Sequence, residues 1–211
     1  MSHFDYVLVI DFEATCDDQN RSWVNEVIEF PIVALQVSTG KIVDEFREYV
    51  RPVRNTRLTS FCTALTGIEQ AQVDAADTFA DVFARAVTWV ENFQAKHPGA
   101  QCLVATCGDW DMQTMLSRQA RLSAVKVPRI FTRWLNVKVL FRQVIASDAT
   151  GRNVGMPGML NALGLSLVGR HHSGLDDSRN IAAITSALIA RGGVLDVTAN
   201  WSPRLMQELC M

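Results

Sequence analysis

The sequence lacks the features that mark secreted and membrane proteins. No apolar run approaches the roughly 20 residues needed to span a bilayer. The N-terminus has no charged segment followed by a long apolar one. The five cysteines are an odd number and never form a C-x-x-C pair. We therefore expect a soluble, intracellular protein with reduced thiols and no membrane partner.

Low-complexity segments and internal repeats are also missing. Of the 211 residues, 48% are hydrophobic and 20% charged, which excludes disordered, collagen-like and coiled-coil proteins. The length predicts a single domain over residues 1–211, with a core at about 6–191 and an appendage at 192–211. We expect no separate second domain, and the sequence identifies no protein partner.

One long segment, residues 112–147, contains no Asp or Glu although the formal net charge is only -2. Residues 1–111 carry 17 acids and 8 bases, whereas residues 112–211 carry 5 acids and 12 bases. A polyanion could lie along the acid-free segment, or its bases could be ordinary solvated helix faces whose stems cover the core. Its bases are Arg118, Arg121, Lys126, Arg129, Arg133, Lys138 and Arg142.

Hydrophobic patterning predicts an α/β fold. The apolar, β-branched run at 6–12 is typical of a strand buried on both faces. Other strands are expected as a hairpin at 27–37 and 42–50, then at 101–106 and 130–136. Helices are expected at 60–65, 68–75, 79–96, 111–122, 159–163 and 175–190, and another helix follows the strand at 130–136 and runs up to residue 145. A surface loop is expected at 147–153. This order predicts a mixed five-stranded sheet flanked by helices.

Two acids stand close together at the end of the first predicted strand. Asp11 and Glu13 are two residues apart, so a regular strand would point both side chains to the same face. Like charges this close are unfavourable unless one is protonated or a cation lies between them. Carboxylate oxygens suit Mg²⁺ or Mn²⁺. Alternatively, both acids simply solvate a strand end.

Further candidate site residues lie after a later predicted strand and at the start of the last long predicted helix. Asp111 comes after the strand at 101–106, at the sheet edge where ligands of open α/β sheets gather; its alternative role is helix capping. His172 stands five residues before Asp177, which begins the last long helix. This arrangement suits a fixed metal ligand beside a base that approaches water. Alternatively, the acid only interacts with the helix dipole and the histidine lies on the surface.

In their order along the chain, five motifs resemble those of the DEDDh 3′–5′ exonucleases, and most closely the Eri1-like exoribonuclease branch. The resemblance covers residues 6–191 and implies a ribonuclease H-like exonuclease fold, in agreement with the predicted mixed sheet. The motifs are Asp11-Phe12-Glu13-Ala14-Thr15-Cys16, Glu29-Phe30-Pro31, Leu65-Thr66-Gly67-Ile68, Trp110-Asp111 and residues 172–177.

The resemblance implies release of nucleoside 5′-monophosphates from RNA 3′ ends, preferentially single-stranded, by a two-metal mechanism. Glu13 and His172 would be catalytic, with His172 as the general base. Two Mg²⁺ or Mn²⁺ ions would be bound by Asp11, Glu13, Asp111 and Asp177. The terminal nucleotides would meet Phe12, Ala14, Leu65, Thr66, Trp110 and His172.

The sequence departs from the family pattern at two positions. His171 stands where we expect proline, and Ser173 where cysteine is frequent. Neither change removes a proposed ligand. The two adjacent histidines leave the identity of the base open, and the five-residue spacing to Asp177 favours His172.

Two alternative functions remain open from the sequence. The active-site acids do not separate an RNA exonuclease from a 3′–5′ DNA exonuclease of the same fold. A catalytically silent nucleic-acid-binding module would usually have lost one of the four acids or the histidine, and here all five residues are present.

Overall fold

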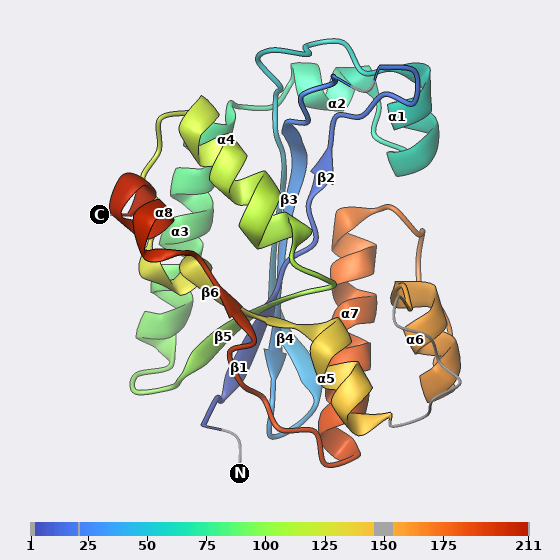
Figure 1. Ribbon diagram of the computed structural model, residues 1–211, viewed down its shortest axis with the longest axis vertical. Coiled ribbons are helices and arrows are strands. Elements are labelled where there is room, and N and C mark those ends of the chain that lie inside the picture. Colours follow the sequence, from blue (N-terminus) through green and yellow to red (C-terminus); the bar gives the residue numbers. More distant parts are fainter. Residues whose placement is uncertain (1–2, 21, 146–153, 211) are drawn as a thin grey trace.

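A computed structural model describes residues 3–20, 22–145 and 154–210, and it has one mixed sheet with helices on both faces (Figure 1). The predicted loop at 147–153 lies outside the described residues. The strands are β1 (Tyr6–Val9), β2 (Glu13–Ala14), β3 (Val27–Gln36), β4 (Lys41–Tyr49), β5 (Cys102–Thr106), β6 (Arg133–Asn136) and β7 (Ala199–Asn200). The α-helices are α1 (Ser60–Thr66), α2 (Gln70–Asp74), α3 (Phe79–Lys96), α4 (Ser117–Leu122), α5 (Val137–Val144), α6 (Met156–Leu163), α7 (Gly174–Ala190) and α8 (Pro203–Leu209).

The first strand is central, as predicted. β1 pairs in parallel with β5 and antiparallel with β3, while β4 continues the sheet beyond β3 and β6 continues it beyond β5. Parallel and antiparallel pairs therefore share one sheet, which confirms the predicted α/β fold.

The predicted number of five strands is too low, because two very short strands extend the sheet to seven. β2 continues β1 along the same edge of β3, so that Val9 faces Val33 and Glu13 faces Glu29. β7 pairs antiparallel with β6 through two residues. Strands of two residues are too short to produce an alternating hydrophobic pattern.

The first strand is also shorter than the predicted 6–12, because regular pairing stops after β1. The amide of Ile10 still donates to Ala105, at 2.9 Å. The amide of Phe12 instead donates to the Asp111 side chain at 3.0 Å. A side-chain acceptor thus replaces the backbone partner where the acids lie.

Helices cover both faces of the sheet. Leu8 and Ile10 of the central segment pack with α3 and α8, and Val7 and Val9 pack with α5, α6 and α7. Figure 1 shows α3, α4 and α8 on one side of the sheet and α5 to α7 on the other. The continuous apolar run at the first strand follows from this two-sided burial.

Some predicted boundaries differ from the structure. The helix predicted at 111–122 begins as a π-helical segment, η1 (Trp110–Leu116), and becomes α4 at Ser117. A 3₁₀ turn, η2 (Arg129–Thr132), replaces the first residues of the strand predicted at 130–136. The helix predicted at 159–163 starts earlier, at Met156. Within the described ranges, no helix is both long and apolar enough to cross a membrane.

Candidate active site

Two predicted ligands lie beyond the carboxyl ends of neighbouring parallel strands. Val9 at the end of β1 pairs with Ala105 of β5, so the residues that follow these strands meet at one sheet edge. Asp11 follows β1, and Asp111 lies in the first turn of η1. The bond from the Phe12 amide to Oδ1 of Asp111, at 3.0 Å, joins the two segments.

The other two predicted ligands come from β2 and α7. Glu13 is buried in β2, and Asp177 is buried in the first turn of α7. One carboxylate oxygen each from Asp11, Glu13 and Asp177 lies within 4.8 Å of the others. Asp111 is not in this group of three, but the Phe12 contact holds it beside the segment that carries Asp11. The tertiary structure therefore brings together all four predicted ligands.

Burial raises the pKa of every acid in this cluster, and repulsion from neighbouring acids adds to this effect at Asp11 and Glu13. Desolvation, followed by the charge of Asp111, raises the pKa of Asp11 well above its usual range. Desolvation and then Glu29 raise the pKa of Glu13 to about 8. Burial also raises the pKa of Asp111 to about 6, and it raises the pKa of Asp177. Such a set of crowded oxygens fits a hard divalent cation, which would offset the repulsion.

Glu29, the third residue of apolar β3, positions the start of α7. Its carboxylate accepts the amides of Gly174 at 3.1 Å and Leu175 at 3.3 Å, and Nε of Arg47 donates to it at 2.7 Å. A Cβ on Gly174 would lie 2.6 Å from the carbonyl oxygen of Asp11. The helix that carries Asp177 can therefore approach Asp11 this closely only with glycine at its first position.

The two histidines contact Asp177 in different ways. Nδ1 of His171 lies 3.0 Å from Oδ2 of Asp177, and the backbone amide of His172 donates to the same oxygen at 2.8 Å. The imidazole rings stack with their centroids 3.9 Å apart. His172 adopts a left-handed backbone conformation, φ 64°, which is uncommon outside glycine. Burial, and then the neighbouring His171, lower the pKa of His172.

The six predicted substrate-contact residues divide by exposure. The side chains of Phe12, Ala14 and Thr66 are buried. Phe12 packs edge-to-face on Phe30 at 4.7 Å, and the Thr66 hydroxyl donates to the Cys62 carbonyl at 2.9 Å. The remaining three are partly or largely accessible, and Trp110 is the most exposed of them at 43%; they are Leu65, Trp110 and His172.

A single arginine connects the histidine segment with α1. Nη2 of Arg170 donates to the carbonyls of Ala64 at 2.8 Å and Leu65 at 3.3 Å. Gly67, at φ 74°, ends α1, and a Cβ there would collide with the Arg170 guanidinium. This contact links the positions of Leu65 and the adjacent histidines.

Glu29, His171 and Lys138 also lie at the site, although the sequence indicated them only as part of a family motif, as an alternative base and as one base of the acid-free segment. An acid inside an apolar strand was a usable signal for Glu29, because buried acids need partners. Lys138 follows β6 on α5, and its charge lowers the pKa of Asp111 against the larger effect of burial. A lysine in a basic segment carries no such signal.

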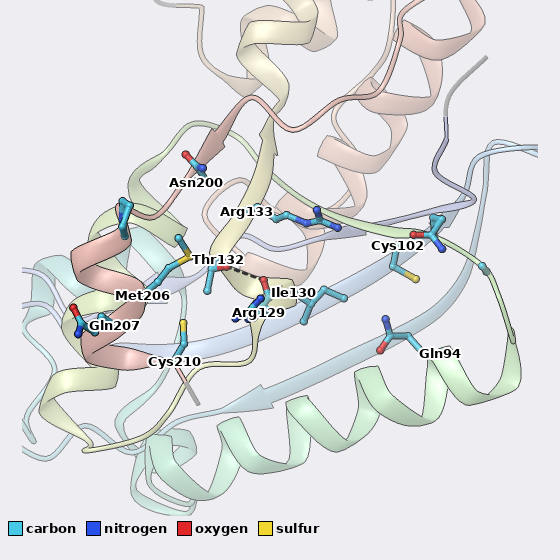
Figure 2. A pocket seen from close by; sticks show the side chains of 13 residues that line it. Gln94, Cys102, Arg129, Ile130, Thr132, Arg133, Asn200, Met206, Gln207 and Cys210 are labelled. Atoms are coloured by element: carbon cyan, nitrogen blue, oxygen red, sulfur yellow. Dashed lines mark hydrogen bonds between the residues drawn. The ribbon is translucent and has the colours of Figure 1, made fainter.

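A large hollow lies away from the acids, at the amino ends of β5 and β6. It has a volume of about 980 Å³ and is lined by Cys102, Arg133 and residues of η2 and α8. Figure 2 shows Arg129, Arg133, Met206 and Gln207 around it. None of the predicted site residues lines this hollow.

Comparisons with known proteins find exonucleases. A family model described as exonuclease matches residues 8–185. Mouse 3′-5′ exoribonuclease 1 is 40% identical over 192 residues, which cover 90% of this chain and 55% of that protein. Human ERI1 exoribonuclease 3 is 39% identical over 196 residues, which cover 93% of this chain and 57% of that protein. The chain thus spans about half the length of these curated relatives.

Two solved structures are similar over nearly the whole chain. The nuclease domain of 3′hExo, a DEDDh family member bound to rAMP, has a TM-score of 0.87 and 39% identity. The match covers 95% of this chain and 99% of that one. Cell-death related nuclease 4 has a TM-score of 0.84 and 30% identity, covering 93% of this chain and 68% of that one.

Proposed function

This chain belongs to the DEDDh family of exonucleases, and on that premise we propose that it removes nucleotides from the 3′ end of RNA. The observation that carries the proposal is the convergence of Asp11, Glu13 and Asp177 within 4.8 Å, beside Asp111. The relatives support RNA as substrate, because they are named 3′-5′ exoribonucleases and one is a nuclease domain bound to rAMP. We also propose that residues 1–211 act as one exonuclease domain, with 192–211 as its appendage.

The four acids would hold two Mg²⁺ or Mn²⁺ ions. When bound, such ions lower the pKa of an attacking water and stabilise the leaving 3′-oxygen. Asp11, Glu13 and Asp177 offer the most closely grouped oxygens, and the Phe12 amide holds Asp111 in position. Because metal binding requires deprotonated carboxylates, the raised pKa of Glu13 makes occupancy dependent on pH.

His172 would accept the proton of the attacking water. Its lowered pKa keeps the imidazole neutral at pH 7, and the neutral ring is the form that can accept a proton. The Asp177 contact with the His172 backbone leaves the ring nitrogens available, whereas Nδ1 of His171 already faces that carboxylate. This contrast favours His172 over His171 as the base.

The terminal nucleotide would lie between Leu65 and Trp110. Leu65 lies in the last turn of α1 and Trp110 begins η1, so two separate elements present accessible apolar surface. Bases can stack on an aromatic side chain without sequence preference. We propose that single-stranded 3′ ends are preferred, because an unpaired base is free to enter such a site.

A labelled-strand assay tests the proposed function. Matched 5′-labelled and 3′-labelled RNA and DNA strands are incubated with purified protein and Mg²⁺, Mn²⁺ or chelator. We expect stepwise shortening of 5′-labelled RNA, immediate loss of the 3′ label as a nucleoside 5′-monophosphate, and no cleavage with chelator. Asp11→Asn should abolish cleavage, while Asp196→Asn, an exposed acid outside the cluster, should not. Equal cleavage by Asp11→Asn, or no cleavage of any strand by the wild type, contradicts the proposal. If the protein cleaves DNA in preference to RNA, its substrate is DNA and not RNA.

A further inference from the structure

Four bases of the acid-free segment lie on two separate surfaces in the structure. Arg129 and Arg133 lie at the hollow near the amino ends of β5 and β6 (Figure 2). Arg118 and Arg121 lie on α4, in a separate groove of about 570 Å³. We call this second surface the α4 groove; it is lined by Arg54, Gln113, Thr114, Arg118, Arg121 and neighbouring residues.

The α4 groove adjoins a segment of the candidate active site. Its lining includes Gln113 and Thr114 of η1, the segment that begins at Trp110 and carries Asp111. Thr114, Arg118 and Arg121 follow at intervals of four and three residues, so they share one helix face. Arg118 follows Asp111 by seven residues, so it lies roughly two turns further along the continuous segment of η1 and α4.

Hydrogen bonds fix both walls of the groove. The buried Glu26 carboxylate accepts the backbone amides of Val53, Arg54 and Asn55 at 2.7 to 2.9 Å. On the other wall, Oε1 of Gln119 accepts the amide of Val27 at 2.9 Å. The loop that carries Arg54 and the helix that carries Arg118 are thus both anchored to the start of β3.

The charge of the groove is positive. None of its lining residues is acidic. Among the described residues, neither Arg54 nor Arg118 forms a salt bridge, and Nη1 of Arg118 donates to the amide oxygen of Asn25 at 3.5 Å. Arg121 is paired with Glu208 at 2.5 Å. Two guanidinium groups from two separate segments of the lining therefore remain available for an anionic ligand.

We propose that the α4 groove binds the sugar–phosphate backbone of the RNA strand on the 5′ side of the scissile bond. The inference rests on the proposed function, because it requires a strand whose 3′ end lies at the acids. Arginine recognises phosphate oxygens through planar, paired donors. Since these contacts are to the backbone, they add affinity without base preference.

Binding measurements test the groove. Fluorescence anisotropy with a labelled 12-nucleotide single-stranded RNA, in chelator and at 50 to 300 mM salt, gives Kd for wild type and for Arg54→Gln/Arg118→Gln. We expect a roughly 10- to 100-fold weaker Kd at the lowest salt, with the difference shrinking as the salt concentration rises. The slope of log Kd against log salt should fall by about 1.4, the value for two phosphate contacts on a single strand. The conservative pair Arg54→Lys/Arg118→Lys should keep most of the slope, because it keeps both charges.

The matched control is Arg129→Gln/Arg133→Gln, which removes the same charge from the hollow at the other end of β5 and β6. We expect it to keep the wild-type slope. If the α4 groove variant keeps the wild-type Kd and slope, or if both double variants lose the same amount, the proposal is overturned. A groove that serves an acidic protein instead of RNA would give the first of these results.

Cleavage by the wild type separates this test from that of the proposed function. If the wild type shortens RNA and the groove variant has an unchanged KM for the 12-mer, only the groove proposal fails. If the wild type cleaves nothing, the proposed function fails. With both proposals correct, KM of the groove variant rises more for the 12-mer than for a trinucleotide.

Discussion

Nδ1 of His171 lies 3.0 Å from Oδ2 of Asp177, the oxygen that also accepts the His172 amide at 2.8 Å. One carboxylate oxygen thus holds the side chain of the first histidine and the backbone of the second. His172 occupies a left-handed backbone conformation beside it. We infer that His171 positions Asp177 and the stacked ring of His172, while His172 acts on the reacting water.

His172→Ala should therefore lower kcat about 10²- to 10⁴-fold, the usual contribution of a general base. His171→Ala should lower kcat less, because it removes a positioning contact. Steady-state cleavage of single-stranded RNA from pH 5.5 to 9 measures both effects. We expect the His171→Ala profile to keep a base-dependent limb that His172→Ala loses. If His171→Ala shows the larger loss and the flatter profile, the base has been assigned to the wrong histidine.

The stability of the metal-free protein should fall as pH rises. Glu13 has a folded pKa of about 8 against an ordinary value of 4.5, so between these values the folded state binds a proton that the unfolded state has released. Its stabilising contribution is complete below pH 4.5 and is lost as pH rises through about 8. Thermal unfolding in chelator from pH 5 to 8 should show a falling Tm, with a shallower fall in Glu13→Gln. Equal slopes for the two proteins would exclude Glu13 as a source of this dependence.

Added Mn²⁺ should counteract the fall of Tm with rising pH. Binding to the folded state raises Tm, and it does so most where the carboxylates are already ionised. The increase caused by Mn²⁺ should thus be larger at pH 8 than at pH 5.5, and should be greatly reduced in Asp11→Asn. A metal effect that is the same at both pH values, or the same in the variant, would contradict a site built from these acids.

Glu29→Gln should destabilise the fold by about 2 kcal/mol, because it weakens charge-assisted bonds to Arg47 and to the first amides of α7. The matched control is Glu45→Gln, whose partner Arg179 lies in a more exposed ion pair. It should cost no more than about 1 kcal/mol. Urea unfolding measures the change in the free energy of unfolding for both variants. Equal changes would show that the burial of Glu29 has no special role.

Gly174→Ala should strongly reduce activity, because the new Cβ would force α7 away from the Asp11 carbonyl, 2.6 Å away. Gly155→Ala is the control, since a Cβ there would only touch the Pro157 ring at 3.8 Å. Cleavage assays with a parallel Tm measurement separate a displaced ligand set from global unfolding. Full activity in Gly174→Ala would show that α7 tolerates the shift.

The order of elements and the type of fold could be predicted from local patterns. The β-branched run that became β1 predicted a central strand, and the spacing of apolar residues predicted the long helices α3 and α7. The ordered motifs around Asp11, Asp111 and Asp177 identified the family, which the comparisons confirm. The roles of the individual residues stay predictions.

The details that shape the site arise from contacts between distant segments. Phe12 leaves the strand pattern because its amide meets a carboxylate 99 residues away. Glu29 reaches amides 145 residues away, and no local pattern indicates that pairing. The bases of the acid-free segment were a single feature in the sequence, but Arg118 and Arg121 lie on a different surface from Arg129 and Arg133.

The sequence by itself determined which side chains are available, because hydrophobic period, chain order and motif spacing are properties of neighbouring residues. Only the tertiary structure decided which of them meet. Hydrogen bonds and charge repulsion act over a few ångströms of space, whatever the separation along the chain. The unequal contacts of His171 and His172 with Asp177 are set in this way, by the direction in which α7 enters the sheet edge.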